Sequence, residues 1–141
     1  DNSSNKKALV IGAGGVSPSV ILSIKKSGIS NISITNRTNE KCIFLKKKYS
    51  FLNIIPWEHL KSEIKNFDII INATSLGLLQ NDKLPFDVNK SSPKAVIADI
   101  IMQPCETELL KKAKKLGRSI HYGKYMIESQ IDLVGEFFNI W

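Results

Sequence analysis

The feature that most constrains the fold is a short apolar run that ends in a glycine-rich turn. The run Lys7–Ile11 reads Lys-Ala-Leu-Val-Ile. It is followed directly by Gly12-Ala13-Gly14-Gly15-Val16-Ser17. A continuous apolar run of this length is typical of a strand buried on both faces, as in a parallel sheet. Apolar residues then recur at helical intervals up to Gly28, which predicts a helix over Ser17–Ser27.

The same alternation of strand and helix repeats along the chain. Strands are predicted over Lys7–Ile11, Asn31–Thr35, Leu52–Ile55, Phe67–Asn72, Ala95–Asp99 and Ser119–Tyr122. Helices are predicted over Ser17–Ser27, Asn39–Tyr49, Glu58–Lys65 and Thr107–Leu116, with a last helix from about Lys124 to Asn139. This order indicates an α/β fold, a doubly wound Rossmann-type parallel six-stranded sheet with helices on both faces. Residues 1–141 are expected to form one domain.

Composition narrows the class of protein. With 141 residues, of which 43% are hydrophobic and 23% charged, the chain has the profile of a globular domain. No apolar run approaches the roughly 18–20 residues that span a bilayer. We therefore expect no membrane partner, and we expect a cytoplasmic location. Two cysteines and two histidines offer too few ligands for a metal site, and none is predicted.

The charge balance favours an anionic partner. The chain has 20 Lys and Arg against 13 Asp and Glu, a net charge of +7, which suits a nucleotide, a nucleic acid or an anionic metabolite. Much of the excess lies in Lys46–Lys48 and Lys111–Lys115, where lysine runs in helices usually form a solvated face. Aromatic residues are not interleaved with these lysines, so a nucleic-acid partner is not expected.

The glycine turn fits the pattern G-x-G-x-x-(small). It lies between the first strand and the first helix, where a dinucleotide-binding fingerprint must lie. Gly12 permits the tight turn, Gly14 lets the backbone approach a pyrophosphate, and Ser17 allows the helix to pack closely on the strand. The first amides of the helix face the anion. A purely structural turn is the alternative, but the position of the motif favours phosphate binding.

The end of the second predicted strand indicates which dinucleotide binds. A domain specific for NAD normally presents Asp or Glu to the adenosine ribose about 20 residues after the turn. Here the sequence reads Thr35-Asn36-Arg37-Thr38. A guanidinium pairs bidentately with a 2′-phosphate and no carboxylate is present to repel it, so the predicted cofactor is NADP. Asn36 and Thr38 are also placed to cap the next helix, a role compatible with phosphate binding.

At these positions the sequence resembles the shikimate dehydrogenase family, specifically its C-terminal NADP-binding domain, over nearly the whole chain. The matching residues are Gly12-Ala13-Gly14-Gly15, Asn36-Arg37-Thr38 with Lys41, Asn72-Ala73-Thr74-Ser75-Leu76-Gly77, Asp99 with Pro104, Thr107, Leu109 and Leu110, and Gly123 with Gln130, Phe138 and Trp141. The resemblance implies an oxidoreductase that reduces 3-dehydroshikimate to shikimate with NADPH, in the shikimate pathway of aromatic amino-acid biosynthesis.

The resemblance also implies roles for individual residues. The cofactor pyrophosphate would lie against Gly12, Ala13, Gly14, Gly15 and Val16, and its 2′-phosphate among Asn36, Arg37, Thr38 and Lys41. Thr74 would lie along the cofactor ribose, and Ile100 and Gly123 would line the nicotinamide site. The substrate would be contacted by Gln130 and at the position of Met102; a solvent-facing helix residue is the alternative for Gln130.

Three residues depart from the family pattern. Leu78 stands where the family usually has Met, an apolar exchange of small consequence. Met102 stands where the family commonly has a Tyr that contacts the substrate, so that hydroxyl is missing. Lys41 replaces the commoner Arg, which keeps the positive charge and loses the bidentate fork.

The family's catalytic Lys and Asp belong to an N-terminal substrate domain, which we expect to be missing from this sequence. No catalytic residue is therefore predicted here, and the chain alone should not turn over, because hydride transfer also needs a held carbonyl and a proton donor. The alternative is a stand-alone dinucleotide-binding module or subunit. The apolar segment Ile131–Trp141 is expected to pack toward the substrate domain and, in the isolated chain, to support a homodimer.

Overall fold

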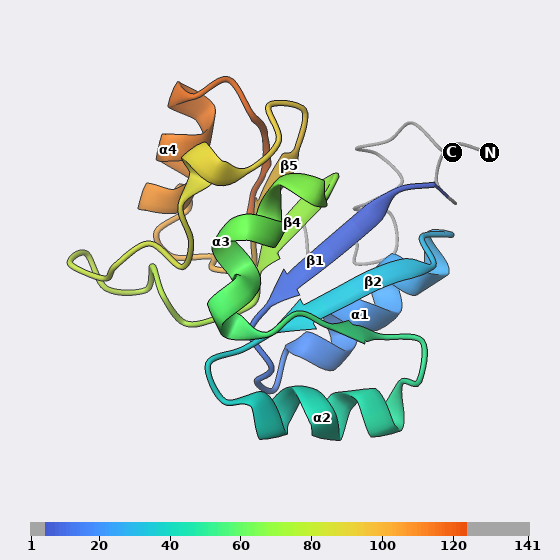
Figure 1. Cartoon of the computed structure of the whole chain (residues 1–141). Coiled ribbons are helices and arrows are strands. Elements are labelled where there is room, and N and C mark those ends of the chain that lie inside the picture. Colours follow the sequence, from blue (N-terminus) through green and yellow to red (C-terminus); the bar gives the residue numbers. More distant parts are fainter. Residues whose placement is uncertain (1–4, 124–141) are drawn as a thin grey trace.

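Six parallel strands form one sheet in the order β3-β2-β1-β4-β5-β6 in a computed structural model that describes residues 5–123 (Figure 1). The strands are β1 (Lys7–Ile11), β2 (Asn31–Thr35), β3 (Asn53–Ile54), β4 (Ile69–Asn72), β5 (Val96–Asp99) and β6 (Ser119–His121). The predicted six-stranded parallel sheet is confirmed, and this strand order is that of a Rossmann-type fold.

Helices cover both faces of the sheet, as predicted. Figure 1 shows α1 (Ser17–Lys26) and α2 (Asn39–Lys48) on one side, and α3 (Leu60–Glu63) and α4 (Glu108–Lys115) on the other. Three short 3-10 helices are also present among the described residues. These are η1 (Trp57–His59) and η2 (Ile64–Asn66) on either side of α3, and η3 (Val88–Lys90) between β4 and β5. Every connection between neighbouring parallel strands therefore crosses over one face of the sheet.

Alternating strand residues build two separate hydrophobic cores. On β1, Ala8 and Val10 face the core under α1 and α2, whereas Leu9 and Ile11 face the core under α3 and α4. On β4, Ile70 faces the second of these cores. All of these side chains are fully buried, which explains why β1 and β4 read as continuous apolar runs without polar alternation.

Some predicted boundaries differ from the observed ones, and the predicted helix over Glu58–Lys65 is α-helical only over Leu60–Glu63. That segment is a chain of 3-10 and α turns, η1, α3 and η2, because only Leu60 and Ile64 on it are buried and no long apolar stripe fixes a regular helix. The strand predicted over Leu52–Ile55 shortens to Asn53–Ile54 at the edge of the sheet. The helix predicted from Lys124 lies outside the described residues.

The lysine runs lie where the sequence places them. Lys46, Lys47 and Lys48 end α2 and are exposed, and the lysines of α4 are exposed around the buried Ala113. Within residues 5–123, no helix has the length and apolar character needed to cross a membrane.

The second core predicts a large loss of stability when a buried side chain of β4 is shortened. Ile70→Ala removes a fully buried side chain between α3 and α4 and should lower the free energy of unfolding by about 2–5 kcal/mol. Urea denaturation of the whole chain measures it. The control Ile43→Ala, at a position on α2 that is 41% exposed, should change stability by less than about 0.5 kcal/mol; equal losses would contradict the assigned core.

Candidate functional site

A cavity of about 600 Å³ opens at the carboxyl edge of the sheet. Strand order reverses between β1 and β4, so the loops that follow these two strands run to opposite faces and leave a crevice, the position where Rossmann-type sheets bind ligands. The described residues that line the cavity are Gly12, Ala13, Gly14, Gly15, Val16, Asn36, Lys41, Ala73, Thr74, Ser75, Leu78, Ile100, Ile101 and Met102.

The turn after β1 requires glycine where it passes β4. Gly12 has a φ of +112°, and a Cβ there would lie 2.9 Å from the backbone carbon and oxygen of Ala73. Gly14 and Gly15 are different, because a Cβ on either would meet no atom within 4 Å. Gly12 therefore closes the contact between β1 and β4, whereas Gly14 and Gly15 leave their backbone open to the cavity.

Hydrogen bonds inside the turn hold the backbone that leads from β1 into α1. The buried Ser17 hydroxyl donates to the Gly12 carbonyl at 2.9 Å, and the Ser17 amide donates to the Gly14 carbonyl at 3.1 Å. The amides of Gly14, Gly15 and Val16 make no hydrogen bond with any other described residue. A helix start with free amides binds an anion well, since the helix dipole adds positive potential there.

Residues after β2 contribute polar and cationic groups to the same cavity. Asn36 and Lys41 line it, and Lys41 is the one charged side chain among the described lining residues. The predicted cap of α2 is wrong in detail: Thr38 is the N-cap residue, yet its side chain makes no capping hydrogen bond, and Asn36 Nδ2 donates to the Thr38 carbonyl at 3.1 Å. The Thr38 hydroxyl is thus left available to a ligand.

Arg37 lies beside the cavity and does not line it. Its guanidinium carbon is 5.7 Å from the centroid of the Trp57 ring, a cation–π contact, and Arg37 lines a second cavity of about 390 Å³ on the α3 side. The contact joins the turn after β2 to η1, twenty residues further along the chain, and no local sequence pattern predicts it.

A buried polar network links the ends of β4 and β5 under the cavity. Asn72 Nδ2 donates to Asp99 Oδ1 at 3.2 Å, and the Asn72 carbonyl oxygen Oδ1 accepts from the amide and hydroxyl of Thr74. Thr107 Oγ1 donates to Asp99 Oδ2 at 2.8 Å, and the Ile101 amide donates to Asp99 Oδ1. Because Thr74 and Ile101 line the cavity, this network fixes its floor.

Two carboxylates near the cavity have opposite pKa shifts. Burial raises the pKa of Asp99 above 3.8, and the hydrogen bonds from Ile101, Thr107 and Asn72 oppose this. The pKa of Asp82 is lowered, because its Oδ2 accepts from the amides of Gly77 and Leu79 at 3.0 Å each. Asp82 thereby closes the loop that carries Leu78 to the cavity wall.

The far end of the cavity is apolar. Ile100 and Met102 line it, and Met102 is 41% exposed, with no hydroxyl to offer. Gly123 packs against this strand end: a Cβ there would lie 2.6 Å from the carbonyl carbon of Ile100 and 2.7 Å from its oxygen. Gly123 therefore packs against Ile100, although it does not line the cavity. Gln130 lies outside the described residues.

The structure thus gathers most of the predicted site residues in one cavity. Thr38, Arg37 and Gly123 lie next to it without lining it. Ala73, Ser75, Leu78 and Ile101 also line it, and their sequence positions alone predict no role for them. The strand-end motif around Thr74 was the available signal for them, since neighbours in a turn share the same edge. No group of three or more His, Cys, Asp or Glu within the described ranges could hold a metal ion.

His121, at the end of β6, is a buried histidine near the site. It is 6% exposed, and its Nδ1–H donates to the carbonyl of Tyr122 at 3.1 Å. Burial lowers the pKa of His121 from 6.5 to about 4, against the opposing effect of that hydrogen bond. His121 is therefore neutral at pH 7.

The fold and the cavity together define a Rossmann-type α/β domain with an anion-receptive glycine turn. A family model described as shikimate / quinate 5-dehydrogenase matches residues 1–108. The chain belongs to the shikimate / quinate 5-dehydrogenase family.

Relatives and solved structures agree with this assignment. A shikimate dehydrogenase (NADP(+)) of Pelagibacter ubique is 43% identical over 140 residues, which is 99% of this chain and 50% of that protein. The shikimate dehydrogenase structure of Aquifex aeolicus has a TM-score of 0.80 at 36% identity, over 99% of this chain and 49% of that one. A quinate dehydrogenase of Corynebacterium glutamicum in complex with NAD, at 23% identity, shares the fold with a TM-score of 0.81 over 98% of this chain and 51% of that one. The chain spans about half the length of these relatives.

The buried network around Asp99 predicts a large loss of stability when one of its hydrogen-bond donors is removed. Thr107→Val deletes the hydroxyl that donates to Asp99 and caps α4 by accepting from the Leu110 amide. The loss should destabilise the chain by about 2–4 kcal/mol, since a buried carboxylate loses a partner and α4 loses its cap. Thermal unfolding measures it, with Thr38→Val at an N-cap that lacks a side-chain bond as the control. A Thr107→Val chain as stable as the control would contradict the network.

The lowered pKa of His121 predicts that the stability of the fold decreases at acidic pH. Because the folded-state pKa of His121 is lowered, protonation favours the unfolded chain, so stability is full above about pH 6.5 and falls as pH drops toward 4. Between pH 8 and pH 5 the His121 contribution should decrease by about 1–2 kcal/mol, measured by urea denaturation at each pH. His121→Gln should remove that part of the slope, and the control His59→Gln, at an exposed position, should retain it. An unchanged slope in His121→Gln would reject the assignment.

Proposed function

We propose that this chain is the NADP(H)-binding domain of an enzyme that interconverts 3-dehydroshikimate and shikimate. The observation that carries the proposal is the cavity at the β1–β4 crevice, which combines the free amides of the glycine turn with Asn36 and Lys41. Family membership and the NADP(+)-dependent shikimate dehydrogenases among the relatives support it.

The donor set of the cavity fits a dinucleotide phosphate. The open backbone at Gly14 and Gly15 lets a pyrophosphate approach the amides of the turn without a side chain in the way. The described lining contains no carboxylate that would repel a 2′-phosphate or pair with a ribose diol. Lys41, the Thr38 hydroxyl and Arg37 beside it are the groups that would hold this phosphate, which favours NADP over NAD.

At the other end, Ile100, with Gly123 packed against its backbone, would receive the nicotinamide. When bound, NADPH supplies the hydride. The chain's own contribution is to hold the ring in an apolar environment, where Ile100, Ile101 and Met102 exclude water. Thr74, anchored through Asn72, would hold the adjacent ribose.

The catalytic Lys and Asp, and most of the substrate site, would come from an N-terminal substrate domain that corresponds to the other half of the relatives. Gln130 and the position of Met102 would face that domain, together with shikimate or 3-dehydroshikimate. Since no group in the described cavity is placed to protonate a carbonyl, we expect no turnover by the 141-residue chain alone. Its expected activity is cofactor binding.

Calorimetric titration of the chain with NADP⁺ and NAD⁺ tests the proposal. NADP⁺ should bind more tightly than NAD⁺, because only NADP⁺ carries the 2′-phosphate. Arg37→Ala should weaken NADP⁺ binding about 10- to 100-fold, the equivalent of losing charge-assisted hydrogen bonds, and leave NAD⁺ binding within about 2-fold.

Lys47→Ala is the matched control for this titration. It removes a positive charge from an exposed position on α2 away from the cavity and should leave both affinities unchanged. Binding of neither cofactor by the folded chain would reject the proposed function. Equal weakening by Arg37→Ala and Lys47→Ala would reject the role of Arg37 and indicate a diffuse electrostatic effect.

A further inference from the structure

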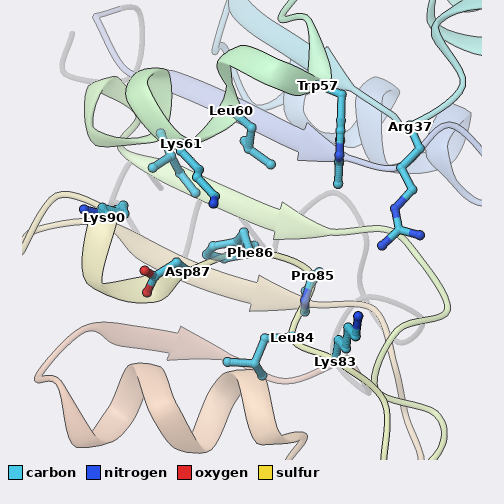
Figure 2. A pocket seen from close by; sticks show the side chains of 11 residues that line it. Arg37, Trp57, Leu60, Lys61, Lys83, Leu84, Pro85, Phe86, Asp87 and Lys90 are labelled. Carbon is cyan, nitrogen blue, oxygen red and sulfur yellow. The ribbon is translucent and has the colours of Figure 1, made fainter.

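The second cavity, on the α3 side of the sheet, is not explained by cofactor binding. It has a volume of about 390 Å³, within the range of small-molecule sites. It lies between the α3 segment and the loop that leads from β4 to η3 (Figure 2). The residues that build it are far from the glycine turn in sequence, and none of them except Arg37 belongs to the predicted cofactor site.

The walls of this cavity are apolar and partly aromatic. Leu60 on one side, and Pro85 and Phe86 on the other, are buried, and the Trp57 ring closes one end beside Arg37 (Figure 2). The buried Ile64 also lines the cavity. Flat aromatic and proline surfaces favour a planar ring as the occupant, because stacked or edge-on rings pack with little void.

The rim of the cavity is cationic. The positively charged residues on it are Arg37, Lys61, Lys83 and Lys90. In the part of the chain that the structure describes, none of these four side chains has a hydrogen bond or ion pair, and Arg37 makes only its cation–π contact. In Figure 2 the Lys61 ammonium group points over Phe86, while Arg37 and Lys83 lie at the other end. Four cations around an apolar space, without protein partners, favour an anionic ligand.

The single carboxylate on the rim does not neutralise these charges. Asp87 caps η3, and its Oδ1 accepts from both the amide and the side-chain nitrogen of Asn89 at 3.0 and 3.1 Å. The charge on the rim is therefore +4 from the bases and −1 from Asp87, a net +3. A neutral or cationic ligand would leave this repulsion in place.

We propose that this cavity binds a small planar aromatic anion, a carboxylate or phosphate on one or two fused rings. The ring lies between Trp57 and Phe86, and the anionic group lies among the rim cations. A further consequence rests on the proposed function: Arg37 also serves the cofactor's 2′-phosphate. Since one guanidinium cannot bind both anions fully, the occupant should weaken NADP⁺ binding and leave NAD⁺ binding nearly unchanged.

Calorimetry with 1-naphthoate tests the site directly, in the absence of cofactor. Saturable binding is expected, and the neutral analogue 1-naphthalenemethanol should bind at least about 10-fold more weakly, because the loss of charge-assisted contacts is of that order. The double variant Lys61→Gln/Lys90→Gln should weaken naphthoate binding at least about 5-fold and leave NADP⁺ binding unchanged. Lys112→Gln/Lys115→Gln, which removes the same charge from exposed positions on α4, is the matched control.

Three results would overturn the proposal: no naphthoate binding by the folded chain, equal affinity for the neutral analogue, or equal weakening by the two double variants. A competition titration then tests the coupling, with saturating naphthoate expected to raise the apparent Kd for NADP⁺ at least about 3-fold and that for NAD⁺ by less. An unchanged Kd for NADP⁺ would overturn the coupling. A chain that binds naphthoate through Lys61 and Lys90 and binds no NADP⁺ would retain this site and reject the proposed function.

Discussion

The close approach of Gly12 to the backbone of Ala73 is the constraint on which the site depends. The Ala73 amide donates to the Ile11 carbonyl at 2.7 Å, so β1 and β4 stay paired up to the point where the chain turns away on both sides. No side chain fits between them at Gly12. This contact places the free amides of the glycine turn opposite Thr74 and Ser75, and the cavity between them follows from it.

The central strands and the well-patterned helices could be predicted from sequence. Burial on both faces leaves continuous apolar runs in β1 and β4, and β2 is marked by its alternating Ile32 and Ile34. Lys7–Ile11 and Asn31–Thr35 have the predicted bounds, and Thr107 and Leu116 are the caps of α4 rather than its ends. The edge strand β3 and the α3 segment were predicted less well, because an edge strand buries fewer residues and a short helix is fixed by tertiary packing, not by its own pattern. The 3-10 helix η3 was missed for the same reason.

Some residues of the candidate site could be predicted from sequence and others could not, again according to whether the information is local. Residues carried by one local motif, such as Gly14 or Asn36, were found because the motif and its place after a strand carry the information. The Asn72–Asp99–Thr107 network and the Arg37–Trp57 contact join separate elements, so no single stretch of sequence indicates them. Arg37 was assigned from its position after β2, but only the structure reveals that it lies between two cavities.

The distribution of charge gives these cavities a common physical character. Among the described residues, the ion pairs are Lys111–Glu108 and Lys114–Glu106, both beside α4, and bases at the cavities such as Lys41 and Lys83 lack such partners. Neighbouring like charges repel, and the helix dipole of α1 adds to the positive potential at the carboxyl edge of the sheet. An anion that binds there relieves repulsion that the folded chain already carries. Ligand binding and stability are therefore linked, because the unfolded chain spreads the same charges apart and gains little from the anion.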